Sequence, residues 1–271
     1  MDLVLHIGAH RTGSTMVAQS LAATIDAYPD CGVVLWGPRH LRAIPGFQAA
    51  ASKFNGDIEP VDKNAAVDLD ELASHFTREI AKERDKGTRT LILSEENVMG
   101  TMRQNFLKGR FYGDVLRRLA GFDSLLPQSA VRIALGIRDY GKVWTSAFHY
   151  MTQMGREQPD KDVARYTMMN DRRGWPEIAA EIRTVWPQSE LLMWRQERLA
   201  REATDICAQI MGLEPNQIVT QTGKVNARLK KTTKTAIFSD DDAKHLTHRY
   251  NRHIRRLKSS DNIRLIGEVA A

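Results

Sequence analysis

The stretch "LHIGAHRTGST", residues 5–15, decides the fold. It joins a short apolar run, 2–8, to a segment in which apolar residues recur at helical spacing, 14–28. Between the two, Gly8 and Gly13 have the G-x-x-x-x-G spacing of a phosphate-binding loop. Glycine lets the backbone approach an anion closely, and the N–H groups and dipole of the following helix favour negative charge. The stretch therefore predicts an anion-binding loop between a strand and a helix.

The rest of the chain alternates short apolar runs with amphipathic segments. This alternation predicts a single α/β domain, 1–271, with three layers: a central, mostly parallel sheet and helices on both faces. Long polar loops at 52–66 and 155–174 are candidates for segments that cover a substrate. Further strands are expected at 32–36, 88–94, 131–137 and, as the last strand, 190–194. Helices are expected at 38–54 with an interruption at Pro45, and at 68–87, 111–122, 142–154, 175–186, 197–211 and 239–258.

Composition is that of a globular protein, with 42% hydrophobic and 27% charged residues. We expect a cytoplasmic protein, because no apolar run is long enough to span a membrane and the N-terminal run is too short for a secretory signal. Two cysteines, Cys31 and Cys207, form no metal or disulfide pattern and are expected to be free thiols. The net charge of +6, concentrated after Lys224, favours an anionic partner.

The loop lacks the lysine of nucleotide triphosphatases. That position holds Ser14, and the loop's cation is Arg11 instead. Hydroxyl groups of Ser14 and Thr15 add donors at the helix start. This arrangement suits a ligand whose single 5′-phosphate carries a transferable group better than it suits a magnesium-bound triphosphate.

The stretch "HIGAHRTGST" resembles the 5′-phosphosulfate loop of sulfotransferases that use 3′-phosphoadenosine 5′-phosphosulfate (PAPS), whose pattern is K/R-[TS]-G-[ST]-[ST]. Bacterial members commonly have lysine where this chain has Arg11. The resemblance implies a P-loop NTPase-like sulfotransferase fold and a transferase activity. It also implies that PAPS binds to His10, Arg11, Thr12, Gly13, Ser14 and Thr15.

A second anion site is expected in "GIRDYGKVWTSAFHY", residues 136–150. Arg138 follows an expected strand and Ser146 lies about two turns into the next helix, so both can face the crevice at the strand ends. This spacing resembles the 3′-phosphate motif of the same family, although many members have proline where this chain has Tyr140. By the same resemblance, Lys224 or Arg228 in the late basic segment is expected to contribute to the cofactor site.

Transfer of a sulfuryl group to a hydroxyl or amine needs a base and a donor for the leaving oxygen. The resemblance implies that this proceeds without a metal, and we assign Arg11 and Ser14 to the leaving side. For the base, "SEEN" (94–97) offers two acids after an expected strand, of which one should face the site. We favour Glu95, with Glu96 and His40 as alternatives. A carbohydrate or small metabolite is the expected acceptor.

Two other functions remain open at this stage. A P-loop kinase or nucleotide triphosphatase fits the loop and the fold class, but Ser14 in the lysine position argues against it. A non-enzymatic binder of polyanions or nucleic acid fits the basic C-terminal segment, but it leaves the two ordered anion sites unexplained. We therefore do not expect nucleic acid as the partner.

Overall fold

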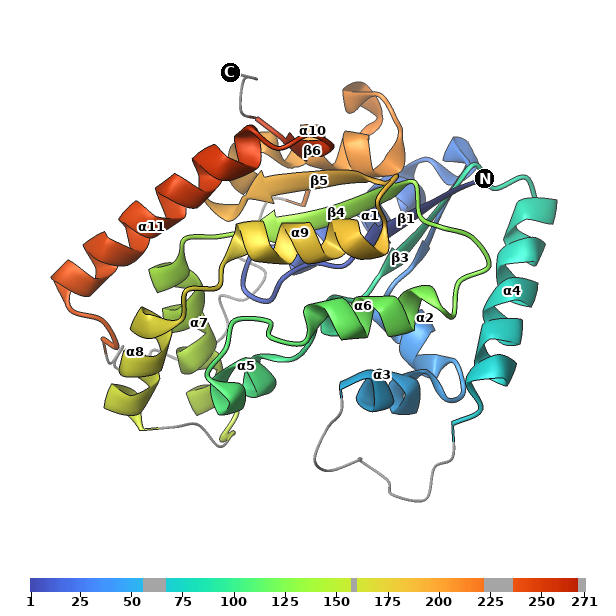
Figure 1. The fold of residues 1–271 in the computed structure, drawn as a ribbon. Coiled ribbons are helices and arrows are strands. Elements are labelled where there is room, and N and C mark those ends of the chain that lie inside the picture. Colours follow the sequence, from blue (N-terminus) through green and yellow to red (C-terminus); the bar gives the residue numbers. More distant parts are fainter. Residues whose placement is uncertain (56–66, 157–159, 222–235, 268–271) are drawn as a thin grey trace.

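The structure, a computed structural model, describes residues 1–55, 67–156, 160–221 and 236–267. Its centre is a six-stranded sheet with the order β2-β3-β1-β4-β5-β6, in which every neighbouring pair is parallel. This arrangement confirms the expected α/β fold class (Figure 1). The strands are β1 (Asp2–His6), β2 (Val33–Trp36), β3 (Thr90–Ser94), β4 (Arg132–Ile137), β5 (Glu190–Arg195) and β6 (Ile263–Leu265).

Helices cover both faces of this sheet. Alternate strand residues divide between two cores, as Leu3 and Leu5 pack into the larger one and Val4 into the smaller. Helices α1 and α10 cover the smaller core, while α4, α6, α7, α9 and α11 cover the larger. The helices are α1 (Ser14–Ala27), α2 (Pro38–Ala43), α3 (Phe47–Asn55), α4 (Leu69–Asp85), α5 (Met102–Lys108), α6 (Val115–Asp123), α7 (Tyr140–Gln153), α8 (Lys161–Asn170), α9 (Trp175–Val185), α10 (Leu199–Met211) and α11 (Asp240–Lys258).

Local chemistry explains where several helices begin and end. Asp68 caps α4 by accepting the N–H groups of Asp70 and Glu71, as its position in the sequence predicts. Ser239 caps α11 in a capping box with Asp242. Pro45 lies in the short gap between α2 and α3, so the expected interruption of that helical segment is confirmed.

Three expectations from the sequence need correction. The run 190–194 does not hold the last strand, because β6 follows it at the edge of the sheet. The segment 155–174 is not a plain loop, because α8 occupies its middle, capped by Asp160. Helix α5 was not expected at all. Strand β6 has three residues and α5 has seven, which is too short for a periodic pattern to stand out.

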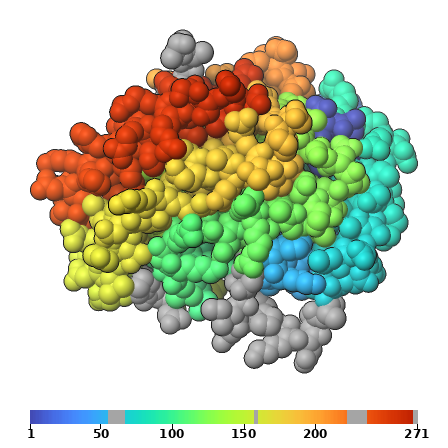
Figure 2. Space-filling model, viewed as in Figure 1, coloured from blue at the N-terminus to red at the C-terminus, as the bar shows by residue number. Residues whose placement is uncertain are grey.

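The carboxyl ends of all these strands lie at the same edge of the sheet, because the strands are parallel. In the space-filling view, α4, α6, α9 and α11 form a continuous surface that hides most of the sheet (Figure 2). Open α/β sheets bind ligands in the crevice at the carboxyl ends of their strands, so this edge is where we expect a site. In the part of the chain that is described, no helix is both long enough and apolar enough to cross a membrane.

Candidate functional site

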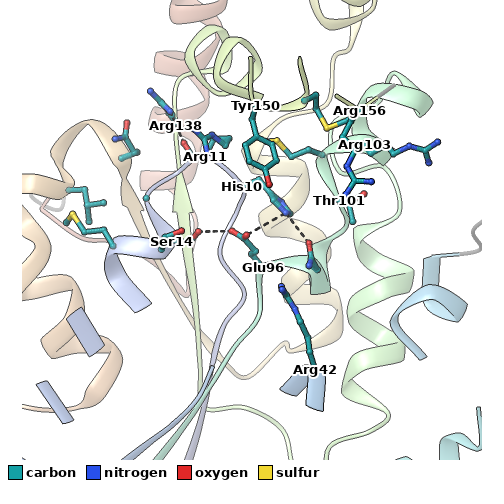
Figure 3. A pocket seen from close by; sticks show the side chains of 18 residues that line it. His10, Arg11, Ser14, Arg42, Glu96, Thr101, Arg103, Arg138, Tyr150 and Arg156 are labelled. Carbon is teal, nitrogen blue, oxygen red and sulfur yellow. Dashed lines mark hydrogen bonds and ion pairs between the residues drawn. The ribbon is translucent and has the colours of Figure 1, made fainter. Parts of the chain in front are cut away.

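A pocket of about 750 Å³ opens at the carboxyl ends of β1, β3, β4 and β5 (Figure 3). Its walls come from the loop after β1, the 3₁₀ turn Glu96–Met99 after β3, Arg138 after β4 and Gln196 after β5, together with the start of α5 and the end of α7. These segments are far apart in the chain. The parallel sheet brings them together, as open α/β sheets do at their ligand sites.

The loop after β1 is held in a fixed conformation. Thr12 is fully buried, and its hydroxyl donates to the Ala9 carbonyl at 2.6 Å, so it supports the loop from below and does not line the pocket. Gly13 has φ +91°, and a Cβ there would lie 2.3 Å from Leu199 Cδ2. Only glycine fits this close approach. The residues that follow, Ser14 and Thr15, begin α1 and line the pocket.

The two expected anion sites meet in space. Arg11 Nε donates to Ser146 Oγ at 2.8 Å, and Arg138 Nη1 donates to the Arg11 carbonyl at 2.8 Å. The Arg11 guanidinium also lies over the ring of Tyr150, 5.4 Å from its centroid. Arg11 and Arg138 line the pocket, whereas Ser146 lies behind them as the partner of Arg11.

Both arginines are half-buried cations. Burial lowers the pKa of both guanidinium groups, because removal from water disfavours the charged form. Within the described residues neither Arg11 nor Arg138 forms an ion pair, and Arg138 Nε is buried with no hydrogen-bond acceptor. A bound anion would supply the missing counter-charge and acceptor at this end of the pocket.

A carboxylate faces these cations from the end of β3. Glu96 lines the pocket with 35% of its side chain exposed, and its Oε2 accepts the Ser14 hydroxyl at 3.0 Å. Its Oε1 lies 4.0 Å from His10 Nε2. Glu96 is thus close to the loop and still open to a ligand, as a group that takes a proton must be.

His10 is positioned by two partners, Tyr112 and Asn97. Its backbone N–H donates to the Tyr112 hydroxyl at 2.9 Å, so the proton of that hydroxyl can point to His10 Nδ1, at 3.3 Å. His10 Nε2 lies 3.2 Å from Asn97 Oδ1, which can only accept. Burial raises the pKa of Tyr112, so this residue stays a neutral donor. The network assigns the imidazole proton to Nε2, on the side of Glu96.

Glu95, the favoured base in the sequence analysis, lies elsewhere. Its carboxylate accepts two hydrogen bonds from Arg42, from Nη2 at 2.6 Å and Nε at 2.7 Å, and a third from the Asn97 N–H at 3.0 Å. Only 3% of the residue is exposed, and it does not line the pocket. The ion pair raises the pKa of Arg42. As expected, one of the two acids faces the site, but the geometry selects Glu96 and not Glu95.

His40, the other expected candidate for the base, does not line the pocket. The His40 ring stacks on Trp36, with 4.7 Å between the ring centroids, and is not part of the lining. We therefore no longer consider His40 as the base. Lys224 and Arg228 lie outside the described residues.

Several pocket residues were missed by the sequence analysis. Asn97 directly follows the two glutamates and could have been included with them. Most of the others lie in or beside helices with no motif that marks them, and they include Arg42, Thr101, Met102, Arg103, Tyr150, Met151 and Arg156. Their side chains reach the pocket through the packing of α2, α5 and α7, which a single sequence does not reveal.

Comparison with known proteins found no family model and no curated protein that matches this chain. The functional interpretation therefore depends on the residues of the pocket and on the two motifs. These residues define an α/β domain whose crevice is lined by arginines and by one open carboxylate among the described residues.

Proposed function

We propose that this protein is a sulfotransferase that moves a sulfuryl group from PAPS to a hydroxyl or amine of an acceptor. One observation carries the proposal: two half-buried arginines without an ion-pair partner in the described part of the chain, Arg11 and Arg138, meet beside the anion-binding loop. The open carboxylate of Glu96 faces the same pocket. That the transferred group is a sulfuryl group follows from the resemblance of residues 5–15 and 136–150 to the two cofactor motifs of PAPS sulfotransferases.

The residues present fit such a cofactor. Two desolvated guanidinium groups, the unpaired Arg138 Nε and the N-terminus of α1 together suit a ligand with anionic groups at both ends. When bound, PAPS would supply an activated sulfuryl group and a phosphate leaving group. Arg11, with the backbone N–H groups at the start of α1, would stabilise the negative charge that develops on the leaving oxygen. Arg138 would hold the 3′-phosphate.

Glu96 would accept the proton from the attacking hydroxyl. His10 Nε2–H, 4.0 Å away, would orient that carboxylate or donate to the acceptor. Ser14 donates to Glu96 in this structure and would turn its hydroxyl to the cofactor when one is bound. Each of these roles needs only groups that already line the pocket.

The test is thermal stabilisation by adenosine 3′,5′-bisphosphate, the product of the donor. At one hundred times its Kd, a ligand that binds only the folded state stabilises it by about 2.7 kcal/mol, which raises Tm by several degrees. We expect this shift without magnesium and a smaller one with ATP. A larger, magnesium-dependent shift with ATP would instead support a kinase or nucleotide triphosphatase.

Arginines at the two ends of β4 give a matched pair of variants. Arg138→Ala should weaken binding of adenosine 3′,5′-bisphosphate about tenfold or more, because it removes a charge-assisted hydrogen bond to the ligand. Arg132 lies at the opposite end of the strand and bonds Asp2 and the Gln209 carbonyl, so Arg132→Ala should leave the affinity unchanged. Equal affinities in both variants would show that the 3′-phosphate does not bind at Arg138.

A further inference from the structure

Tyr112 is a buried residue that reaches the site from behind the pocket wall. Only 2% of it is exposed, and it is not among the described residues that line the pocket. Its hydroxyl accepts the backbone N–H of His10 at 2.9 Å and lies 3.3 Å from His10 Nδ1. Burial raises the pKa of this hydroxyl, so it keeps its proton. Because a buried O–H group needs an acceptor, that proton points to Nδ1.

The backbone of Tyr112 is strained and firmly held. Its φ is +49°, in the left-handed region that bulky residues rarely adopt. The Tyr112 N–H donates to Asn105 Oδ1 at 3.0 Å, and its carbonyl accepts Arg173 Nη2 at 2.9 Å. Arg173 is itself buried and forms an ion pair with Glu181. Strained residues fixed by their surroundings cluster at functional sites, and this one places its hydroxyl against His10.

His10 lies between Tyr112 and the open carboxylate. With Nδ1 acting as an acceptor, the ring proton is on Nε2, which lies 3.2 Å from Asn97 Oδ1 and 4.0 Å from Glu96 Oε1. Figure 3 shows the His10 ring beside Glu96 within the pocket. Asn97 by itself does not select this tautomer, because its amide can present either the oxygen or the NH₂ group. The selection is therefore made by Tyr112.

We propose that Tyr112 is a positioning residue of the transfer reaction, which fixes the orientation and tautomer of His10 so that Nε2–H faces Glu96 and the acceptor. This inference rests on the proposed function. In the reaction, the acceptor oxygen forms a bond to sulfur, the bond between sulfur and the phosphate oxygen of the donor breaks, and the acceptor proton passes to Glu96. Tyr112 neither gains nor loses a proton and acts through His10.

A double-mutant cycle tests whether Tyr112 acts through His10. Turnover is measured at saturating labelled sulfuryl donor, with a hydroxyl acceptor found by screening, for the unaltered protein, Tyr112→Phe, His10→Ala and the variant with both changes. Tyr112→Phe should lower turnover about fivefold, because it removes one hydrogen bond, with little change in affinity for adenosine 3′,5′-bisphosphate. In the His10→Ala protein, the same exchange should lower turnover no further.

Tyr140 provides a matched control. Its buried hydroxyl likewise accepts a backbone N–H, that of Trp175 at 2.8 Å, and lies 2.8 Å from His253 Nδ1. Tyr140 is not among the described lining residues of the pocket. Tyr140→Phe should therefore lower the free energy of unfolding about as much as Tyr112→Phe does, but leave turnover at saturating donor unchanged. An equal loss of turnover in both variants would mean that Tyr112 acts only through the stability of the fold.

Nitrogen NMR of the histidine rings gives a measurement that does not depend on activity. At mildly alkaline pH, His10 of the unaltered protein should carry its proton on Nε2, and its Nδ1 signal should shift in Tyr112→Phe. The signals of His10 are identified by their absence in His10→Ala. A proton on Nδ1, an Nδ1 signal that Tyr112→Phe leaves in place, or additive losses of turnover in the cycle would each overturn the proposal.

Failure of the proposed function would look different. If His10 shows the expected tautomer and the expected shift, but the unaltered protein binds no adenosine 3′,5′-bisphosphate and transfers no sulfuryl group, the sulfotransferase proposal fails. The positioning of His10 by Tyr112 would then still stand. If the protein binds the bisphosphate and transfers the sulfuryl group, but Tyr112→Phe keeps full turnover, the role of Tyr112 fails and the sulfotransferase proposal stands.

Discussion

Exchanging each of the two adjacent glutamates for glutamine should have opposite consequences. Glu96→Gln is expected to remove most of the transfer activity and to leave the fold intact. Glu95→Gln is expected to destabilise the fold and to leave the chemistry of the open carboxylate in place. The pair differs by one position in the chain, so the two variants control for each other.

The exposure and hydrogen bonds of the two glutamates set the expected size of each effect. Glu96 is 35% exposed, and a glutamine carbonyl can still accept the Ser14 hydroxyl, so the free energy of unfolding should change by no more than about 0.5 kcal/mol. Loss of a general base slows a reaction by about 10²–10⁴. Glu95 is 3% exposed and bonds Arg42 twice, but Arg42 is 40% exposed and can be rehydrated. We therefore expect Glu95→Gln to cost about 2 kcal/mol, less than two full charge-assisted bonds.

Two measurements separate the variants. Turnover is followed with a labelled sulfuryl donor at saturating concentration, using a hydroxyl acceptor found by screening. The free energy of unfolding is taken from urea titration. Affinity for adenosine 3′,5′-bisphosphate should be unchanged in Glu96→Gln, which shows that its loss of turnover is a loss of chemistry. If Glu95→Gln stops turnover at normal stability while Glu96→Gln stays active, the assignment of the base is wrong.

Two further predictions concern the support of the loop and the effect of pH. A Cβ at Gly136 would lie 2.7 Å from Thr12 Oγ1 and 3.1 Å from the Trp194 ring. Gly136→Ala should therefore displace the loop, lower the free energy of unfolding by about 1–3 kcal/mol and weaken binding of adenosine 3′,5′-bisphosphate. If neither the free energy of unfolding nor the affinity changes, the neighbours of Gly136 move aside without cost. Burial lowers the pKa of His6 from 6.5 to about 4, and that of His253 likewise to about 4. At a pH between about 4 and 6.5, both histidines are protonated in the unfolded chain but stay neutral in the folded protein. Stability should thus fall as pH drops from 6.5 to 4, by up to about 3 kcal/mol for His6. Urea titrations of His6→Gln should show a shallower fall, and an identical pH profile would contradict this origin.

The parts of the fold that depend on local signals could be predicted from the sequence. Strand β1, the glycine loop and α1 follow one another within the first 27 residues, and each carries its own pattern. Asp68 marks the start of α4 because a cap acts on the next two or three N–H groups. Arg138 was found in the pocket because the end of a parallel strand fixes where the next residue lies.

The features of the site that could not be predicted depend on contacts between residues that are distant in the chain. The choice between Glu95 and Glu96 is made by Arg42, 53 residues before Glu95, and nothing in the sequence marks that pair. Arg103 and Arg156 become neighbours of the site only through the packing of α5 on α7. From a single sequence, it is easier to predict which segments reach the pocket than to predict which side chains face it.

The position of β1 between β3 and β4 bears on how the domain assembles during synthesis. Strand β1 pairs on one side with residues 90–94 and on the other with residues 132–134, all of which are translated after it. As it leaves the ribosome it has neither neighbour, and both of its edges are open to the wrong pairing. The loop after β1 therefore reaches its final position late, once the middle of the chain has been translated and Arg138 can donate to the Arg11 carbonyl.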